Sequence, residues 1–367
     1  MARLERPSSA RLLLVALVAA ALVVPTMAVF ASSPNDQGRG GGNKSHFNKP
    51  GNLLITDQFN NRVIEVDPNT NAIVWSFGSN DPTLCNPGPG AIIGSNYAER
   101  LSDGLTVMAG TGIPPGASSA MPNGCVDNRV IVVDQEGDIV WQYGQAGVTG
   151  SGPNQLNVPV SVIQLPNHDY LIVDQGNNRV IEVNQDKQVV FSYGPTSGPG
   201  ALNNPNSAEL LKNGHILIAD ENNNRVIEIT RDGQIVWQFS AGIQFAAFAS
   251  RLPNGDTLIT DSGHARIIEV TPSMQVVFEY FTNTQPGSNP SPLPTNAVML
   301  HDGDIAIADQ FNNRAFVINE DKQVVFQYGQ LNLAGNGPNQ LNAPYTAFVI
   351  GDYTGQTPPP GMGEEER

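Results

Sequence analysis

The side chains best suited to acid–base or metal chemistry are five histidines, which are His46, His168, His215, His264 and His301. Three of them, His168, His215 and His301, fall in or beside predicted turns at one rim of the molecule, away from any shared centre. No His-x-His, His-Glu-x-x-His or Cys-x-x-Cys pattern occurs, so zinc ligation has no support. A Gly-x-Ser-x-Gly turn and a phosphate-binding glycine loop are also absent. We therefore predict no catalytic residue, no metal and no cofactor.

Carboxylates and amides also recur at fixed places. Five aspartates end an apolar stretch, and in four copies an asparagine follows three residues later. The aspartates are Asp57, Asp174, Asp220, Asp261 and Asp309, and the asparagines are Asn60, Asn177, Asn223 and Asn312. Calcium prefers such oxygen ligands, but the Asp-x-Asp-x-Asp-Gly spacing of a calcium loop is absent. Asp and Asn side chains also hold tight turns by bonding backbone N–H groups, which is the interpretation we favour.

These aspartates belong to a repeat that occurs six times, at 51–78, 103–144, 167–194, 213–240, 254–281 and 302–329. An arginine marks each copy, and successive arginines are 67, 50, 46, 41 and 48 residues apart. The arginines are Arg62, Arg129, Arg179, Arg225, Arg266 and Arg314. A period of this size with several short strands per unit is typical of a propeller. We predict an all-β six-bladed β-propeller of four-stranded antiparallel blades, closed when the C-terminal segment 343–352 joins the first blade.

Two further series indicate how the blades pack. A glutamate lies three positions after four of the arginines, and odd spacing in a strand puts the two side chains on opposite faces. We expect each arginine to reach a carboxylate of the neighbouring blade. Aromatic residues on the fourth strands are expected to pack between blades. The glutamates are Glu65, Glu182, Glu228 and Glu269, and the aromatic residues are Trp75, Trp141, Phe191, Trp237, Phe278 and Phe326.

The repeat also carries a family resemblance. The motif Gly-Pro-Asn-Gln-Leu-Asn-x-Pro at 152–159 and 337–344, together with Asp-x-x-Asn-Asn-Arg-Val-Ile, resembles the NHL-repeat family of six-bladed propellers over residues 51–353. A weaker resemblance, through Asn-Arg-Val-Ile-Glu and Ile-Val-Trp, is to extracytoplasmic propellers of the arylsulfotransferase type. The first resemblance implies the fold. It does not single out a function, because members of the NHL-repeat family include secreted enzymes, sensor modules and binding platforms.

Three functions remain open. We expect a binding module for a protein, a peptide or a small polar ligand at the loop-rich face of the ring. The alternative is an extracytoplasmic enzyme, either a lyase or an arylsulfotransferase-like transferase. A purely structural surface protein is the third interpretation. The net charge of −15 repels phosphate backbones, so nucleic acid is not an expected partner.

The first residues predict the compartment. Basic residues precede an apolar run at 12–24 within segment 1–31, as in a signal peptide. An uncleaved anchor, which would bring the chain to a membrane, is the alternative; either way we expect a secreted or extracytoplasmic protein. We interpret 32–50 as a flexible glycine-rich linker, 51–353 as the propeller and 354–367 as a disordered Pro/Glu tail.

Cys85 and Cys125 are the two cysteines of the chain, and both fall in long loops on the same predicted face. Outside the cytoplasm such a pair indicates one disulfide, although two free thiols are the alternative.

A candidate ligand site comes from comparing the first strands of the blades. One row of equivalent positions is nearly all alanine, as a crowded layer near the axis requires. The row before it varies and is mostly polar, with Tyr97, Ser161, Ser207, Phe248, Asn296 and Thr346. We predict that this row lines one mouth of the central channel and binds the ligand; a water-filled tunnel is the alternative.

Overall fold

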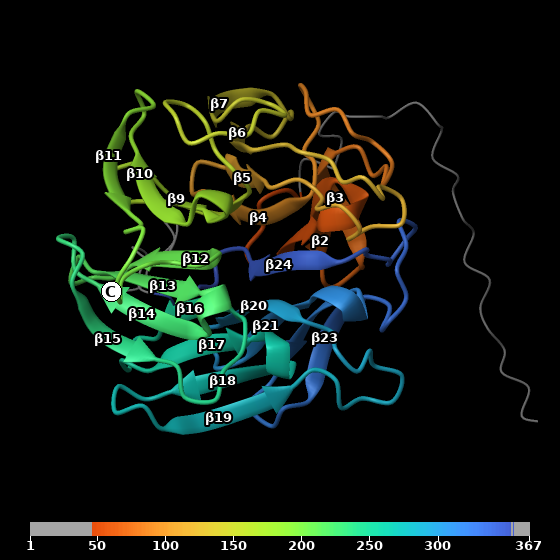
Figure 1. Ribbon diagram of the computed structural model, residues 1–367. Helices are drawn as coiled ribbons and strands as arrows, with labels where there is room; N and C mark the ends of the chain where they lie inside the picture. Colours follow the sequence, from red (N-terminus) through yellow and green to blue (C-terminus); the bar gives the residue numbers. More distant parts are fainter. Residues whose placement is uncertain (1–45, 354, 356–367) are drawn as a thin grey trace, which may run out of the picture. The chain divides into compact units, whose positions relative to one another are not determined.

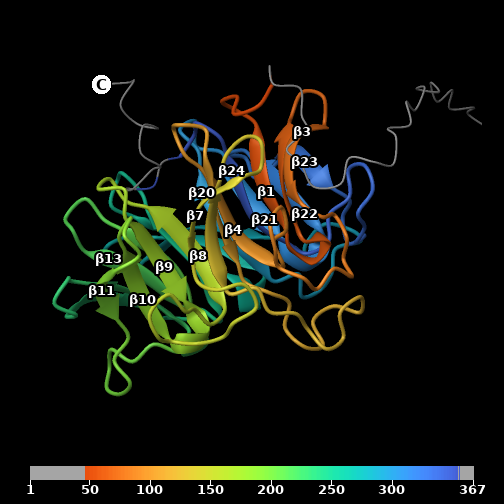
Figure 2. The ribbon, with the colours of Figure 1, turned by 90° about the horizontal axis from the view of Figure 1, so that it is seen from above.

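The computed structural model describes residues 46–353 and 355. The predicted signal segment, the linker up to residue 45 and the tail apart from Gly355 lie outside these residues. Six antiparallel sheets of four strands are arranged around a common axis (Figures 1 and 2). The predicted fold class, an all-β six-bladed propeller, is therefore confirmed. Within the described range, no helix is long and apolar enough to cross a membrane.

We number the blades in chain order and give their strands from the axis outward. Blade 1 contains β24 (Pro344–Val349), β1 (Leu53–Asp57), β2 (Arg62–Asp67) and β3 (Ala72–Gly78). Blade 2 contains β4 (Ser95–Arg100), β5 (Thr106–Gly110), β6 (Arg129–Val133) and β7 (Ile139–Tyr143). Blade 3 contains β8 (Pro159–Gln164), β9 (Tyr170–Asp174), β10 (Arg179–Val183) and β11 (Val189–Tyr193).

The remaining blades repeat this pattern. Blade 4 contains β12 (Pro205–Leu210), β13 (Ile216–Asp220), β14 (Arg225–Ile229) and β15 (Ile235–Phe239). Blade 5 contains β16 (Ala246–Arg251), β17 (Thr257–Asp261), β18 (Arg266–Val270) and β19 (Val276–Phe281). Blade 6 contains β20 (Pro294–Met299), β21 (Ile305–Asp309), β22 (Arg314–Ile318) and β23 (Val324–Gly329).

The ring closes as predicted. Strand β24, from the C-terminal end of the propeller, pairs antiparallel with β1, and Leu53 lies opposite Val349. The hydroxyls of Thr56 and Thr346, 3.2 Å apart, add a buried hydrogen bond between the same two strands. Each blade contacts the next, so blade 1 and blade 4 face each other across the axis. Closure also pairs the inner edge of β1, which would otherwise be an exposed strand edge.

Five blades turn from their second to their third strand through a short 3₁₀ helix. These helices are η1 (Gln58–Asn60), η2 (Gln175–Asn177), η3 (Glu221–Asn223), η4 (Ser262–His264) and η5 (Gln310–Asn312). In blade 1, Asp57 accepts hydrogen bonds from Asn60 Nδ2 and from the backbone N–H of Asn342, both at 2.7 Å. The repeated aspartates therefore hold turns, as we favoured.

The prediction that each repeated arginine reaches a carboxylate of the neighbouring blade is wrong. Arg62 Nε donates to Asp57 of its own blade at 2.7 Å, and the equivalent pair Arg314–Asp309 is fully buried at 2.9 Å. The reason is register, because Asp57 and Arg62 lie opposite each other on neighbouring strands. Cross-strand partners point to the same face, so this aspartate is the nearest carboxylate.

Three of the four glutamates, Glu65, Glu182 and Glu228, do pair with the next blade, but with arginines outside the repeated series. Arg100, at the end of β4 in blade 2, binds Glu65 of blade 1 at 2.8 Å, and both side chains are buried. The Arg100 guanidinium also lies 4.7 Å from the Trp75 ring, whose Nε1 donates to the carbonyl of Gln135 in blade 2. The predicted packing of aromatic residues between blades is confirmed at this position.

Candidate functional site: the axial mouth on the loop-rich face

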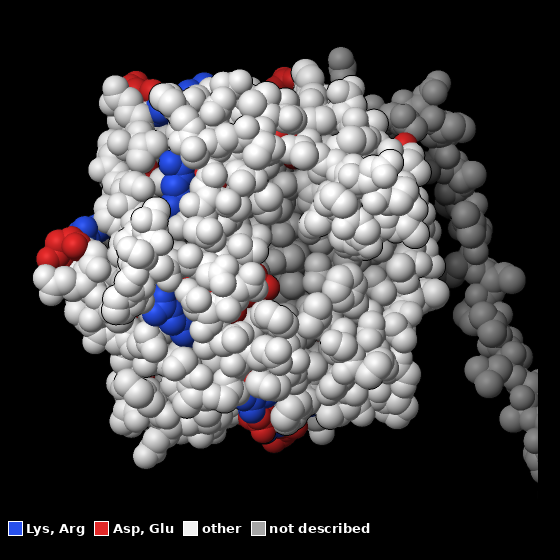
Figure 3. Space-filling model, viewed as in Figure 1, with Lys and Arg blue, Asp and Glu red and all other residues white. Residues whose placement is uncertain are grey.

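One face of the ring carries the long loops. The connection between β5 and β6 and the connection between blades 1 and 2 both lie on this face, where the backbone N–H of Gly112 donates to the carbonyl of Ile93 at 2.9 Å. The 3₁₀ turns also form backbone hydrogen bonds with the connections between blades. For example, the N–H of Phe59 donates to the carbonyl of Asn342. We call this side the loop-rich face. Figure 3 looks onto it and shows a hollow near its centre.

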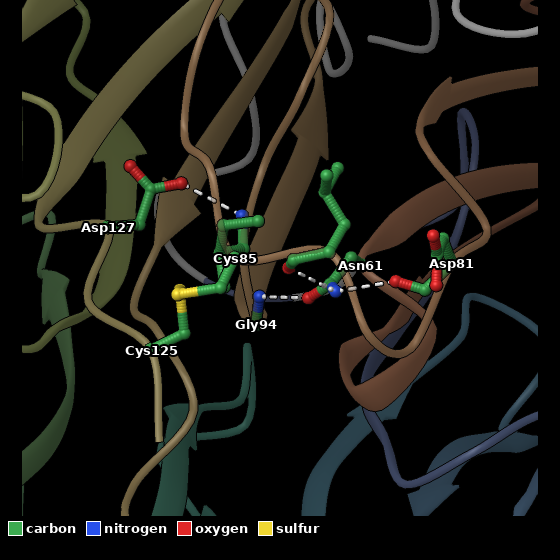
Figure 4. The surroundings of a disulfide bond; sticks show 8 residues. Asn61, Asp81, Cys85, Gly94, Cys125 and Asp127 are labelled. Atoms are coloured by element: carbon green, nitrogen blue, oxygen red, sulfur yellow. Dashed lines mark hydrogen bonds between the residues drawn. A yellow bond between two sulfur atoms is a disulfide. The ribbon is translucent and has the colours of Figure 1, made fainter. Parts of the chain in front are cut away.

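A disulfide ties two loops of this face together. Cys85 and Cys125 are bonded, with their Cα atoms 5.6 Å apart, which confirms the predicted pair. Hydrogen bonds reinforce the same region, since the backbone N–H of Gly94 donates to Asn61 Oδ1 at 3.0 Å and that of Ile93 donates to Asp127 Oδ2 at 2.8 Å (Figure 4). The connection between β5 and β6 of blade 2 is therefore anchored to the neighbouring loops.

The predicted ligand row lies on the six inner strands, as expected, but its side chains are buried. Ser207 Oγ accepts a hydrogen bond from the backbone N–H of Ala249, and Asn296 Oδ1 accepts one from Ala347, both at 3.2 Å. Each bond joins one inner strand to the next. The row thus connects neighbouring blades, and direct ligand contact by it stays a prediction.

The axis is not an open tunnel at this level. Phe348, on the closing strand, packs against Tyr97 with ring centroids 5.3 Å apart and against Phe248 at 6.5 Å. Tyr353 follows the closing strand and lies 6.4 Å from the Phe348 ring. These aromatic side chains, from blades 1, 2 and 5 and from the segment after β24, pack against one another at the axis.

At the end of the axis on the loop-rich face, a hydrogen bond spans the ring. Asn206 of blade 4 donates from Nδ2 to the hydroxyl of Tyr345 of blade 1 at 2.7 Å. The same amide donates to Glu221 Oε2 at 2.9 Å, and Gln175 Nε2 donates to that oxygen at 3.3 Å. Glu221 and Gln175 are the first residues of η3 and η2, so the turns bring their side chains to the axis.

Amides continue around this end. Gln58 Nε2 donates to Asn96 Oδ1 at 2.6 Å, and Gln310 Nε2 donates to Gln58 Oε1 at 3.0 Å. Tyr345 is also hydrogen-bonded to Asn96. We define the axial mouth cluster as Gln58, Asn96, Gln175, Asn206, Glu221, Gln310 and Tyr345. Its donors and acceptors are held by one another, which is the preorganisation that a small polar ligand needs.

Glu221 is the single carboxylate of the cluster. Burial raises the pKa of this carboxyl to about 7, and the hydrogen bond from Asn206 opposes the shift. Burial, together with the nearby Glu221, raises the pKa of Tyr345 as well. Near neutral pH both the acid and the carboxylate form of Glu221 are therefore populated, and carboxyls with such raised pKa values cluster at functional sites.

The opposite end of the axis holds a second polar group, with two carboxyls and two phenols. The hydroxyl of Tyr97 donates to Glu99 Oε2 at 3.0 Å, and the hydroxyl of Tyr353 lies 3.4 Å from Glu209 Oε1. Burial raises the pKa of Glu99 to about 8, with the bond from Tyr97 opposing it. At this end too, a side chain from blade 1 reaches one from blade 4.

The histidines do not assemble into a centre. His215 Nδ1 lies 2.7 Å from Glu228, His264 lies 2.9 Å from Asp261, and His301 lies 2.6 Å from Asp352. Each belongs to a different blade or turn. Among the residues that the structure describes, no group of three or more His, Cys, Asp or Glu side chains is arranged to hold a metal.

The sequence analysis missed the axial mouth cluster, although a signal for it is present. Asn96, Asn206 and Tyr345 stand one residue before the predicted row and vary between blades as strongly as that row does. The position after the second-strand aspartate, read through the blades, holds Gln58, Thr111, Gln175, Glu221, Ser262 and Gln310. One acid in an otherwise uncharged series marks Glu221 as the exception.

Comparisons with known proteins identify the fold. No family model matches the chain, and no curated protein matches it. A protein of unknown function from Bacteroides caccae superposes with a TM-score of 0.58 at 16% identity, over 81% of this chain and 99% of that one. Virginiamycin B lyase from Staphylococcus aureus gives 0.51 at 16% identity, over 82% and 86%. A chain of a nidogen/laminin complex gives 0.53 at 11% identity, over 82% and 98%.

Proposed function

We propose that this chain is an exported, NHL-like binding module that takes a small polar ligand, or a polar segment of a peptide or protein, at the axial mouth cluster. One observation carries the proposal, namely the bond between Asn206 and Tyr345 that closes the mouth with polar groups. A closed end lined by fixed amides can enclose a ligand, whereas an open tunnel could not.

The surroundings support the same function. Long loops on a rigid scaffold are where binding residues are commonly found. The Cys85–Cys125 bond holds two such loops near the mouth, and it is consistent with an extracytoplasmic location. The residues of the predicted row, including Ser161, Ser207 and Thr346, lie one position after the mouth residues on the inner strands. We therefore propose that they support the ligand site from beneath. A chain of a nidogen/laminin complex shares the fold, which gives protein binding a precedent.

Glu221 favours an enzyme as the second candidate. A carboxyl with a pKa of about 7 is suited to act as a general base near neutral pH. Virginiamycin B lyase shares the fold, which makes lyase chemistry a reasonable class to assay. Turnover of a bound compound that is lost in Glu221→Gln, while binding persists, would favour this second function over the first.

A thermal-shift screen tests the proposal. The probes are neutral monosaccharides, amino acids, dipeptides and primary amines, each added to the purified chain. We expect at least one class to raise the Tm of the wild type and not that of the double variant Gln58→Ala/Gln175→Ala. The matched control is Gln275→Ala, which removes an exposed glutamine in the turn before β19. Equal responses from all three proteins, or no response to any class, would refute the site.

A further inference from the structure

We infer that Glu221 recognises a primary ammonium group of the ligand, through the carboxylate oxygen Oε1. The inference rests on the proposed function and adds the chemical class of the ligand to it. It starts from the position of Glu221 as the only carboxylate in a cluster of five amides and one phenol.

The two oxygens of Glu221 have different surroundings. Both of its hydrogen bonds, from Asn206 and Gln175, are accepted by Oε2. Among the described residues no hydrogen bond reaches Oε1, and this oxygen is not fully buried. The donors orient the carboxylate and leave one oxygen available to a ligand.

In the part of the chain that the structure describes, no Lys, Arg or His side chain forms an ion pair with that oxygen. The nearest repeated arginines are committed to aspartates, since Arg225 Nε binds Asp220 and Arg179 Nε binds Asp174, both at 2.7 Å. Within the described residues no ion pair includes Glu221. A partly buried carboxylate without a positive partner carries an uncompensated desolvation cost, and a cationic ligand would offset it.

An ammonium fits the remaining groups better than a metal ion does. An ammonium has three donors and no acceptor, so it needs several oxygens at hydrogen-bond distance. Gln175, whose Nε2 donates to Glu221, brings a second acceptor, its Oε1, to the same group of side chains. A calcium ion takes six to eight oxygens and usually more than one carboxylate, whereas the cluster offers a single carboxylate.

Protonation of Glu221 then controls affinity. Because burial raises the pKa of this carboxyl to about 7, the acid form predominates below neutral pH and cannot pair with a cation. An ammonium stabilises the carboxylate form, so its binding lowers the pKa of Glu221 and releases a proton. Affinity should therefore rise with pH, by about tenfold between about pH 6 and about pH 8 for a single group.

Other charged groups near η3 do not compete for this role. The strands packed against η3 are β12, β14 and β16. On them, Arg225 is paired with Asp220, Arg251 binds Glu228 at 3.0 Å, and Glu209 accepts the backbone N–H of Arg251. From β24 the titratable group is Tyr345, whose raised pKa keeps its phenol neutral through this range.

The experiment uses n-butylammonium as the probe and n-butanol as its neutral counterpart. Ligand-observed NMR gives the Kd of each at about pH 6 and about pH 8, where the amine stays protonated. For the wild type we expect butylammonium to bind about tenfold more tightly at the higher pH, and butanol to show no pH dependence. Glu221→Gln, which keeps the shape of the side chain, should lose both the affinity and the pH dependence.

Two controls make the outcome decisive. Gln275→Ala should behave as the wild type does, and the Tm of Glu221→Gln should show that it is folded. If Glu221→Gln binds butylammonium as the wild type does, general attraction to the acidic protein explains the signal, and the inference fails. If neutral probes bind at the mouth and butylammonium does not, the inference fails while the proposed function stands. If no class of probe binds, both fail.

Discussion

The hydroxyl of Tyr345 accepts a hydrogen bond of 2.7 Å from Nδ2 of Asn206, and the two residues belong to blades that face each other across the ring. The structure therefore joins opposite blades directly at the axis. Tyr345 lies on β24, so the strand that completes blade 1 also forms the floor of the mouth.

Replacing Tyr345 with Phe should lower stability by about 1 kcal/mol, because the partly buried hydroxyl loses its hydrogen bonds to Asn206 and Asn96 while the ring remains. Urea unfolding measures the change. The matched variant Tyr353→Phe removes the longer contact of 3.4 Å at the other end and should cost less. Equal effects from both variants would contradict the view that the Asn206 bond is the stronger link.

Deleting 343–352 should unfold the ring or cause association. Blade 1 would keep three strands, and the inner edge of β1 would lose its partner β24. Light scattering with size-exclusion chromatography and a melting curve report both outcomes. A truncated chain that stays monomeric with an unchanged Tm would show that β24 is dispensable.

Replacing Cys85 and Cys125 together with serine should lower the free energy of unfolding by about 2–4 kcal/mol. The bond closes a loop of 40 residues and so limits the unfolded chain. Denaturant unfolding of the wild type with and without a reductant gives an independent value. If neither the variant nor the reduced protein is destabilised, the bond makes no contribution to stability.

Glu99 should make stability fall as pH rises. Burial raises the pKa of Glu99 to about 8, above the ordinary value of 4.5, so the folded state holds this proton more tightly than the unfolded state does. The contribution is complete below about pH 4.5 and is lost as pH rises to about 8, with a slope of at most about 1.4 kcal/mol per pH unit. Glu99→Gln stays neutral at every pH, so urea unfolding at several pH values should show it close to the wild type at low pH, with the two curves separating as the wild type loses stability toward about pH 8. A constant difference between them would contradict the assignment.

The repeat predicted the ring, its closing strand and the disulfide, because each depends on spacing along the chain. The partner of Arg62 depends on register between two strands, and spacing within one strand pointed to the wrong carboxylate. The mouth depends on an irregularity: pairing between inner and second strands shifts between Ser95 and Tyr97, and again between Pro205 and Ser207. Such a bulge re-aims the side chain at its centre, here Asn96 and Asn206, and the sequence marks these positions only by their variation between blades.

The pairing of β24 with β1 also has a consequence for how the chain is made. Thr56 and Thr346 are separated by 290 residues, and they become neighbours only when the last strand arrives. Until then blade 1 is incomplete, so the growing chain carries an unpaired strand edge throughout synthesis. Contacts between such distant residues fold slowly. The last six residues of the ring, Pro344–Val349, thus remove the unpaired edge through which an incomplete chain could associate with another.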